Sequence, residues 1–374
     1  MESKTAPKKP AEKAEGSQPV ILELLAAHGG ERHLIVLQDY PDPDAIASAF
    51  AHQLIAASFN VESDVIYAGR ISHQQNVALV KLLGLDLIHY EGELPAPYDG
   101  AIFVDNQGTT CEVIVKALQT AAVPTLLVVD HHQPQERLQP AVSDVRPVGA
   151  TSTLYAEYLQ QGALALNRTE PSHVLVATAL MHGILTDTGG LIQATAADFQ
   201  AAAFLSPFVD NELLVEIMNQ ARSKHVMEII RLALGNRVVA EGFSMAGVGY
   251  LRPSDRDAVP QAADFLLTEE NVHTAIVYGI VSGENQAETL VGSLRTAKIT
   301  LSPDEFIKEV FGKNGDGRYY GGGKALAGGF EVPVGFLSGG SAATYQDLKW
   351  QVFDGQVKQK LFHKIGVEPK AMNN

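Results

Sequence analysis

From His33 to about His132, short apolar runs alternate with longer segments in which apolar residues recur at helical spacing. The clearest apolar runs are residues 33–38, 101–105 and 125–130. Helical segments lie between them at residues 44–59 and 73–84. Strands that alternate with helices in this way pair in parallel and are covered by helices on both faces. The sequence therefore predicts an α/β fold with a doubly wound parallel sheet.

The remainder of the chain has a different pattern. Helical periodicity continues from about Ser152 to Gly235, and strand-like segments then precede a glycine-rich stretch. The segment 211–236 should form one or two helices with a break near Ser223. We expect five parts, namely a disordered leader over 1–18, a first domain over 19–215, a helical linker over 216–238, a smaller α+β domain over 239–343 and a C-terminal helix over 344–374.

The C-terminal helix is predicted to be amphipathic. Phe353, Val357, Leu361 and Ile365 stand four residues apart and would form one apolar face. Docking of this face on the chain's own surface is the favoured interpretation, and a homodimer contact is the alternative.

The charge balance limits what the chain can bind. Its 374 residues contain 43 Asp and Glu against 28 Lys and Arg, which gives a formal net charge of −15. A long duplex of nucleic acid is therefore excluded as a partner, because proteins bind its backbone through Lys and Arg. The single cysteine, Cys111, excludes a disulfide framework and fits a reducing compartment. No apolar stretch approaches the ~20 residues that cross a bilayer, so we expect a cytoplasmic protein with no membrane partner.

Acidic side chains and histidines follow the apolar runs. They are Asp42 and Asp44 after the first run, Asp105 after the next, Asp130-His131-His132 after the third, and Asp187 in a later turn. In open α/β sheets, ligands bind beyond the carboxyl ends of the strands, where the loops converge. Clustered carboxylates raise one another's pKa unless a cation lies among them. Oxygen ligands with imidazole and no thiolate suit Mn²⁺ or Mg²⁺, so the sequence predicts a metal site.

Each motif taken alone also has a purely structural interpretation. Residues 42–44 form an ordinary helix start, with an N-cap aspartate and a proline in the first turn. Asp105 can cap a loop, and Asp187 can close an Asx-turn. The Asp-His-His run is harder to explain by packing, whereas His182 and His33 are expected to be structural. The combination of motifs, rather than any one of them, indicates the metal site.

These motifs, in this order, resemble those of the DHH phosphoesterases. They are Pro41-Asp42-Pro43-Asp44-Ala45, Asp105, Asp130-His131-His132 and Thr186-Asp187-Thr188-Gly189-Gly190. The stretch Gly321-Gly322-Gly323-Lys324, with Ala327-Gly328-Gly329, resembles the signature of the DHH-associated C-terminal domain. The resemblance covers about residues 20–340 and is to the stand-alone oligoribonuclease and pAp phosphatase type. It implies a catalytic domain over 19–215 and a substrate-binding domain over 239–343.

The resemblance also implies roles for the motif residues. The centre would hold two Mn²⁺ ions, with Mg²⁺ or Co²⁺ as alternatives. Asp105 and Asp187 would touch both ions, Asp42 would complete one, and Asp44 with His131 the other. His132 would face the substrate phosphate, and Asp130 would orient the neighbouring imidazoles.

Two positions depart from the family pattern. Gln38 stands where the first motif opens with a histidine ligand, and its amide oxygen is a weaker neutral ligand. We therefore predict weaker metal binding at that position. Lys324 stands where the associated domain has a histidine, so a contact with phosphate can persist without histidine's pH dependence.

The expected substrate side lies in the C-terminal domain. Ser293-Leu294-Arg295 resembles the family's Ser-x-Arg segment, which grips phosphate or nucleotide. Gly321, Gly322 and Gly323, beside Lys324, would let backbone N–H groups approach an anion, although three glycines alone indicate a mobile loop. Residues 291–330 hold six Lys and Arg against four Asp and Glu, a modestly basic window in an acidic chain.

These observations predict a metal-dependent phosphohydrolase or phosphodiesterase that uses a metal-activated water. The expected substrates are short: oligonucleotides (nanoRNA), pAp, or linear or cyclic dinucleotides. An exopolyphosphatase or pyrophosphatase is the alternative among enzymes. A nucleotide-binding sensor with weakened catalysis is the alternative of another class, suggested by Gln38 and Lys324.

Overall fold

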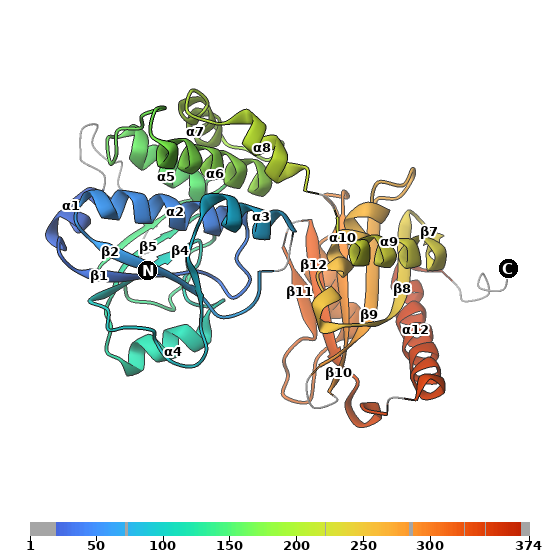
Figure 1. The fold of residues 1–374 in the computed structure, drawn as a ribbon. Helices are drawn as coiled ribbons and strands as arrows, with labels where there is room; N and C mark the ends of the chain where they lie inside the picture. Colours follow the sequence, from blue (N-terminus) through green and yellow to red (C-terminus); the bar gives the residue numbers. More distant parts are fainter. Residues whose placement is uncertain are drawn as a thin grey trace, which may run out of the picture. The chain divides into compact units, whose positions relative to one another are not determined.

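The computed structural model describes residues 20–71, 74–220, 222–283, 287–324, 326–340 and 342–367. The leader expected over 1–18 lies outside these residues. The chain divides into two compact units, Met1–Gln220 (unit 1) and Ala221–Asn374 (unit 2), and each contains its own sheet. Figure 1 shows the helices and strands of both units.

Unit 1 is built from alternating strands and helices, followed by a run of helices. Its elements are α1 (Val20–Ala27), β1 (Arg32–Val36), α2 (Pro43–Ser58), β2 (Glu62–Tyr67), α3 (Gln74–Leu83), β3 (Leu87–His89), β4 (Gly100–Val104), α4 (Glu112–Thr120), β5 (Thr125–Asp130), β6 (Val142–Val145), α5 (Thr151–Gln160), α6 (Pro171–Asp187), α7 (Ala196–Leu205) and α8 (Asn211–Met218).

The unit 1 sheet is parallel throughout, in the order β3-β2-β1-β4-β5-β6. Successive side chains of a strand point to opposite faces. On β1, Ile35 therefore packs with the helices that include α2, α5 and α6, whereas Leu34 and Val36 pack with α4 on the other face. The predicted doubly wound sheet is confirmed. Its strand order reverses between β1 and β4, the place where such sheets bind ligands.

Unit 2 mixes strands with helices on both faces of its sheet. Its elements are α9 (Lys224–Asn236), β7 (Val238–Ala240), β8 (Phe243–Leu251), a 3₁₀ turn η1 (Pro253–Asp255), α10 (Ala258–Leu266), β9 (Thr274–Ser282), β10 (Glu288–Thr296), α11 (Pro303–Phe311), β11 (Gly321–Gly323), β12 (Ala327–Pro333), η3 (Gly335–Leu337) and α12 (Ala343–Ile365).

The unit 2 sheet has the order β11-β12-β10-β9-β8-β7. Strands β8 and β9 are parallel, and the other neighbours are antiparallel. Helices α9 and α10 supply side chains to the core on one face, and α11 and α12 to the core on the other. This mixed sheet is the smaller α+β fold that the sequence predicts.

Two helices can be compared with their sequence predictions. Helix α9 lies in the segment expected to be a linker, and it begins at the predicted break, where Ser223 accepts a hydrogen bond from the Val226 backbone N–H. Its apolar face, including Ile229 and Ile230, is buried in unit 2. Helix α12 packs on the same unit through Val357 and Leu361, which agrees with docking on the chain's own surface.

Within the described part of the chain, no helix combines the length and apolarity that crossing a membrane requires.

Candidate metal centre and substrate cavity

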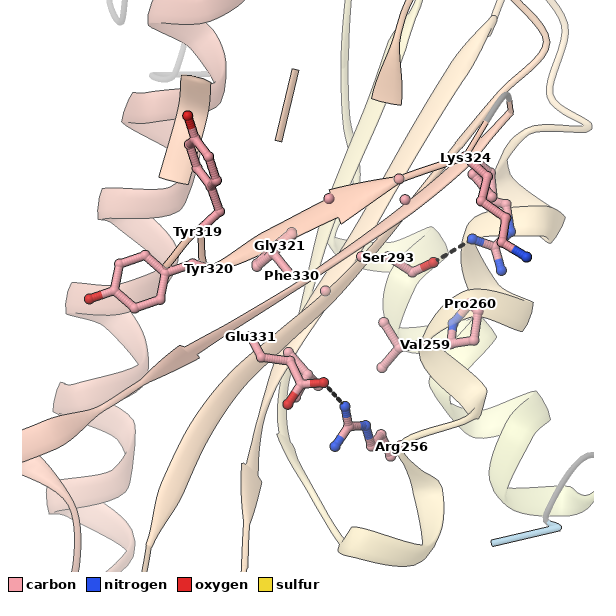
Figure 2. A pocket seen from close by; sticks show the side chains of 18 of the residues that line it. Arg256, Val259, Pro260, Ser293, Tyr319, Tyr320, Gly321, Lys324, Phe330 and Glu331 are labelled. Carbon is pink, nitrogen blue, oxygen red and sulfur yellow. Dashed lines mark hydrogen bonds and ion pairs between the residues drawn. The ribbon is translucent and has the colours of Figure 1, made fainter. Parts of the chain in front are cut away.

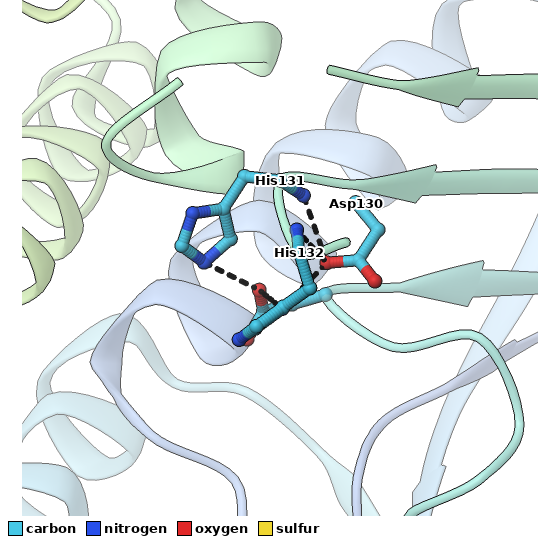
Figure 3. Close-up of side chains that lie close together, drawn as sticks. Asp130, His131 and His132 are labelled. Carbon is cyan, nitrogen blue, oxygen red and sulfur yellow. Dashed lines mark hydrogen bonds and ion pairs between the residues drawn. The ribbon is translucent and has the colours of Figure 1, made fainter. Parts of the chain in front are cut away.

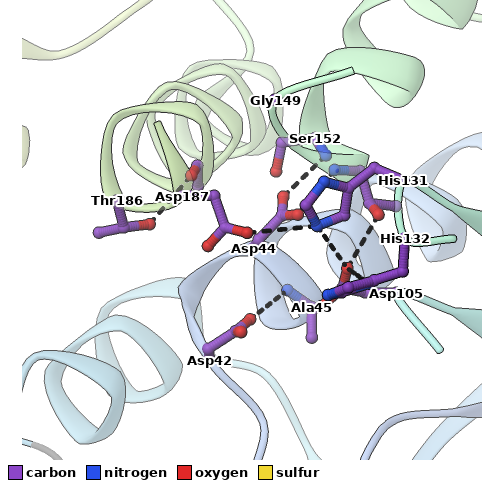
Figure 4. Close-up of polar contacts among 12 residues, drawn as sticks. Asp42, Asp44, Ala45, Asp105, His131, His132, Gly149, Ser152, Thr186 and Asp187 are labelled. Carbon is purple, nitrogen blue, oxygen red and sulfur yellow. Dashed lines mark hydrogen bonds and ion pairs between the residues drawn. The ribbon is translucent and has the colours of Figure 1, made fainter. Parts of the chain in front are cut away.

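The carboxylates predicted at the strand ends come together in unit 1. Asp105 directly follows β4, and Asp130 is the last residue of β5. Asp42 and Asp44 lie at the start of α2, in the connection that leaves β1, and Asp187 is the last residue of α6. Figure 4 shows the side chains of four of these residues converging with His131 and His132. The parallel sheet and α6 thus bring residues from four separate sequence motifs together.

Asp105 is the most enclosed carboxylate of the cluster. It is 1% exposed, and its φ of 58° lies in the left-handed region, which a non-glycine residue occupies at a cost in energy. Oδ1 accepts a hydrogen bond of 2.9 Å from Thr151 Oγ1, whereas Oδ2 is buried with no hydrogen-bond partner. Burial first, and then the charges of Asp42 and Asp44, raise the pKa of Asp105 well above its ordinary value.

Asp44 is fully buried against the beginning of α5. Its two oxygens accept hydrogen bonds of 2.7 Å from the backbone N–H groups of Thr151 and Ser152. These are the first residues of α5, and the partial positive charge at the N-terminus of a helix favours a negative charge there. Burial, followed by the charges of Asp187 and Asp42, nevertheless raises the pKa of Asp44 to about 7.

The approach of α6 to this point requires a glycine. A Cβ on Gly183 would lie 2.3 Å from Ser152 Oγ and 3.1 Å from Asp44 Oδ1. Any larger residue would push α6, and with it Asp187, away from the cluster.

His131 has one ring nitrogen anchored and the other turned towards the carboxylates. Its Nδ1 lies 3.1 Å from the Val148 carbonyl oxygen, which can only accept, so Nδ1 carries the proton. Nε2 lies 3.3 Å from Asp187 Oδ2 and 3.5 Å from Asp105 Oδ1. Burial alone would lower the pKa of His131, but the carboxylates of Asp187 and Asp44 outweigh it and raise the pKa to about 9.

Asp130 and His132 form a separate hydrogen-bonded pair, shown in Figure 3. Asp130 Oδ1 lies 2.8 Å from His132 Nδ1 and also accepts from the backbone N–H groups of both histidines. Gln107 Nε2 donates to Asp130 Oδ2 at 2.7 Å. Burial alone would raise the pKa of Asp130, but the hydrogen bonds from His132 and Gln107 hold it below its ordinary value. The ionised Asp130 therefore fixes the His132 ring with Nδ1 protonated.

Asp42 has the structural role of an N-cap, as its sequence context suggested. Oδ1 accepts from the Ala45 backbone N–H at 2.9 Å, and Pro43 is the first residue of α2. Oδ2 accepts from Gln38 Nε2 at 3.1 Å. Gln38 therefore meets Asp42 as a hydrogen-bond donor, while the sequence prediction treats its amide oxygen as a weak ligand.

These residues fit a divalent cation. Ligand atoms of Asp44, His131 and Asp187 lie within 4.8 Å of one another, and so do those of Asp105, Asp130, His131 and His132. The buried, unpartnered Oδ2 of Asp105 and the raised pKa values of two carboxyls show an uncompensated concentration of negative charge. Asp44, Asp105, His131 and Asp187 would be the ligands, with Asp42 beside them. Such a cation can lower the pKa of a bound water and polarise a phosphoryl oxygen.

Sequence reasoning missed two contributors to this centre. Thr151 and Ser152 hold Asp44 through their backbone, and Thr151 also donates to Asp105. The only sequence signal is a run of small polar residues in the first turn of a helix, which is typical of many helix starts. His182, expected to be structural, is buried within α6.

Unit 2 contains a cavity of about 600 Å³. All six residues predicted to bind substrate line it, namely Ser293, Arg295, Gly321, Gly322, Gly323 and Lys324. Figure 2 shows the cavity with Ser293 and Lys324 near one end and Tyr319 and Tyr320 at another. The fold thus brings residues from two distant segments of the chain to one surface.

Arg295 is held in place by two partners. Its guanidinium lies 2.9 Å from Asp264 Oδ1 and donates a hydrogen bond of 2.9 Å to Ser293 Oγ. A second ion pair in the cavity, Arg256 with Glu331, was not foreseen because its partners are far apart in sequence. The two arginines of the cavity are therefore each balanced by a carboxylate.

The three glycines form an edge strand, β11, and not a mobile loop. They pair with residues 328–330 of β12. A Cβ on Gly321 would lie 2.2 Å from the Gly329 carbonyl oxygen, and a Cβ on Gly323 would lie 2.7 Å from that of Ala327. At Gly321 and Gly323 the lack of a side chain is therefore required by close packing of the backbone.

Comparisons with known proteins show what the chain is similar to. An uncharacterized protein, MJ1633, of Methanocaldococcus jannaschii is 34% identical over 339 residues, which are 90% of this chain and 64% of that protein. The chain thus spans less than two thirds of the relative it matches.

A solved exopolyphosphatase-related protein of Bacteroides fragilis is similar in fold. The match has a TM-score of 0.65 and 15% identity and covers 92% of this chain and all of the other, 100%. A structure of RecJ with Mn²⁺ from Thermus thermophilus matches 92% of this chain and 54% of that one at 13% identity, with a TM-score of 0.45.

The family description "DHH family, N-terminal domain" matches residues 33–184. This range contains β1 and the motifs around Asp42, Asp105 and Asp130. The chain therefore carries the N-terminal domain of the DHH family at residues 33–184.

Proposed function

We propose that this protein is a metal-dependent phosphohydrolase that cleaves short oligonucleotides or small phosphorylated nucleotides. The observation that carries the proposal is the buried cluster around Asp105. Several carboxylates share a small volume there, one carboxylate oxygen has no partner, and His131 presents Nε2 to two of them. A divalent cation neutralises such a cluster and supports hydrolysis of phosphate esters.

Each residue of the centre has a role in this proposal. Asp44, Asp105, His131 and Asp187 hold the cations, and Mn²⁺ or Mg²⁺ suits these ligands best because they are rich in oxygen. His132, fixed by Asp130, contacts a phosphate oxygen and assists proton transfer.

Unit 2 is proposed to bind the nucleotide. Arg295 offers a planar fork for phosphate, Lys324 adds a point charge, and Tyr319 or Tyr320 offers a surface for a base. We assign this unit to the DHH-associated type of domain, on the glycine motif and on the cavity it lines. A homodimer and a cytoplasmic location remain part of the proposal and rest on the sequence alone.

A polyphosphatase is the second candidate function. The Bacteroides fragilis protein that shares the fold is described as exopolyphosphatase-related. The two functions differ in what the cavity must recognise, since polyphosphate has no sugar or base.

One assay separates these functions. The full-length protein is loaded with Mn²⁺ and incubated with pAp, pApA, cyclic-di-AMP, pyrophosphate and short-chain polyphosphate. We expect release of phosphate or mononucleotide from one or more of the nucleotides, and loss of this activity when the metal is chelated. Faster hydrolysis of polyphosphate than of every nucleotide would favour the second candidate. Tight nucleotide binding with no product would support a sensor and contradict the proposed enzyme.

A further inference from the structure

A second group of potential metal ligands lies in unit 1, near the start of β1 and away from the strand ends that carry the acidic centre. His28, Glu31 and His33 belong to the connection between α1 and β1 and to the first residues of that strand. Glu31 Oε2 lies 2.8 Å from His28 Nδ1 and 3.1 Å from His33 Nε2. Two imidazole nitrogens from different residues therefore converge on one carboxylate oxygen.

The backbone holds these three side chains in place. The Glu31 backbone N–H donates to the His28 carbonyl oxygen at 3.2 Å, which closes a turn, and Gly30 adopts the required positive φ of 92°. The Gly30 N–H donates to the Asn60 carbonyl oxygen at 2.8 Å, and the Glu62 N–H donates to the Glu31 carbonyl oxygen at 3.0 Å. The turn is thus fixed to the neighbouring chain before any ligand binds.

The spacing of the donor atoms suits a transition-metal ion. An ion with tetrahedral geometry and bonds of ~2.0–2.1 Å holds its ligand atoms about 3.3 Å apart. The two nitrogen–oxygen separations, 2.8 and 3.1 Å, are shorter than this. A small outward movement of the partly exposed His28 and Glu31 side chains would therefore admit the ion. His28 and Glu31 are 28% and 34% exposed, which leaves one side for a water ligand, whereas His33 is fully enclosed.

The protonation states also suit metal binding. Burial lowers the pKa of His33, so its ring is neutral at pH 7. Burial alone would raise the pKa of Glu31, but the hydrogen bonds to His33 and His28 outweigh it and lower the pKa, so its carboxylate is ionised. Arg32, the nearest cation in sequence, is paired with Asp64 at 2.7 Å, which offsets its charge.

We propose that His28, Glu31 and His33 bind one divalent transition-metal ion of the Zn²⁺ type. Two imidazoles and a carboxylate favour Zn²⁺, Ni²⁺ or Cu²⁺ over Mg²⁺ or Ca²⁺. The bound ion ties the turn after α1 to β1 and thereby stabilises unit 1. This site differs in ligand type from the acidic centre and does not depend on the proposed enzymatic function.

The test is a comparison of Zn²⁺ binding by three full-length proteins: the wild type, His28→Ala and the control His225→Ala. His225 is an exposed histidine of α9, outside the cluster. His28 is chosen because His33 is buried and its replacement endangers folding. Equilibrium dialysis with metal analysis measures the stoichiometry, and thermal unfolding with and without Zn²⁺ measures the stabilisation.

We expect His28→Ala to bind one Zn²⁺ fewer than the wild type and the control, and to lose part of the Zn²⁺-induced rise in Tm. Glu31→Gln should do the same. Equal stoichiometry in all proteins would overturn the proposal, as would anomalous diffraction from Zn²⁺-soaked crystals that shows no ion at this cluster. Mn²⁺-dependent hydrolysis in His28→Ala should equal that of the wild type, so a failure of this site is distinguishable from a failure of the acidic centre.

Discussion

The acidic centre of unit 1 and the cavity of unit 2 handle charge in opposite ways. In the centre, Asp44 and Asp105 are buried with other carboxylates around them, and their pKa values are raised. In the cavity, Arg295 faces Asp264 and Arg256 faces Glu331, so each arginine already has an internal partner. The first region holds more carboxylates than cationic groups, whereas both arginines of the second are already paired.

This difference has consequences for ligand binding. Burying like charges together costs free energy, so the binding of a cation in the acidic centre should be strongly favoured electrostatically. A phosphate that enters the cavity must compete with carboxylates for the same guanidinium groups, so its gain is smaller. We therefore expect substitutions in the centre to abolish the reaction and substitutions in the cavity to change which substrate is preferred.

The largest effect is expected for Asp105→Asn. This change removes a charged ligand and should reduce kcat/KM by about 10³-fold or more, ~4 kcal/mol of barrier. Its stability without metal should be equal or higher, because repulsion among the carboxylates falls. The exposed carboxylate Asp86 supplies the matched control, Asp86→Asn, with activity near the wild type. Retention of activity in Asp105→Asn would remove the basis for the metal centre.

A smaller loss is expected for His132→Gln. The imidazole that Asp130 orients contributes proton transfer, which is typically worth ~10²–10⁴-fold. Loss of that contribution should reduce kcat, while metal stoichiometry measured by dialysis stays unchanged. If the variant instead loses a bound metal with its activity, His132 is a ligand and not a substrate contact.

Arg295→Ala should affect substrates unequally. Hydrogen bonds to charged groups are worth ~1.5–3 kcal/mol, so hydrolysis of pApA should fall about 10- to 100-fold. Hydrolysis of pyrophosphate should change much less, since it lacks the second, nucleoside-linked phosphate that Arg295 would hold in the cavity. Arg231→Ala, on the exposed face of α9, is the control. Equal losses for both substrates would contradict nucleotide recognition by unit 2.

The smallest expected effect is a pH dependence of stability in the metal-free protein. The pKa of Asp44 rises from 3.8 to about 7 on folding, because burial favours the protonated carboxyl. Its contribution to the free energy of unfolding is therefore complete at low pH and is lost as the pH rises through about 7. Between about pH 6.5 and about pH 8.5, Tm should fall by a few degrees, ~1 kcal/mol for a domain of this size. Mn²⁺ should reverse the fall, and Asp105→Asn should weaken it. A Tm that rises over this range would show that the carboxylates are already compensated.

The convergence of these side chains can be predicted from the sequence for a physical reason. Apolar runs mark the parallel strands, and the carboxyl ends of such strands meet at one edge, so Asp105, Asp130 and the acids of α2 could be brought together without coordinates. Thr151 and Ser152 could not be found in this way. They act through backbone N–H groups, and any residue type supplies such groups at a helix start.

In unit 2 the sequence was less informative. The glycines of β11 are consistent with a loop or with a strand, and only the short distance from Gly321 to the backbone of β12 decides between them. The amphipathic pattern of α9 likewise does not specify which core covers its apolar face. The ion pair between Arg256 and Glu331 joins two segments that no local pattern connects.

The central claim is that the carboxylates at the ends of the unit 1 strands hold divalent cations. Anomalous diffraction at the manganese edge, from crystals of the full-length protein grown with Mn²⁺, tests this claim most directly. We predict strong anomalous density among Asp44, Asp105, His131 and Asp187, and its loss in crystals of Asp105→Asn. An absence of density at this cluster in crystals of protein that hydrolyses its substrate would contradict the account.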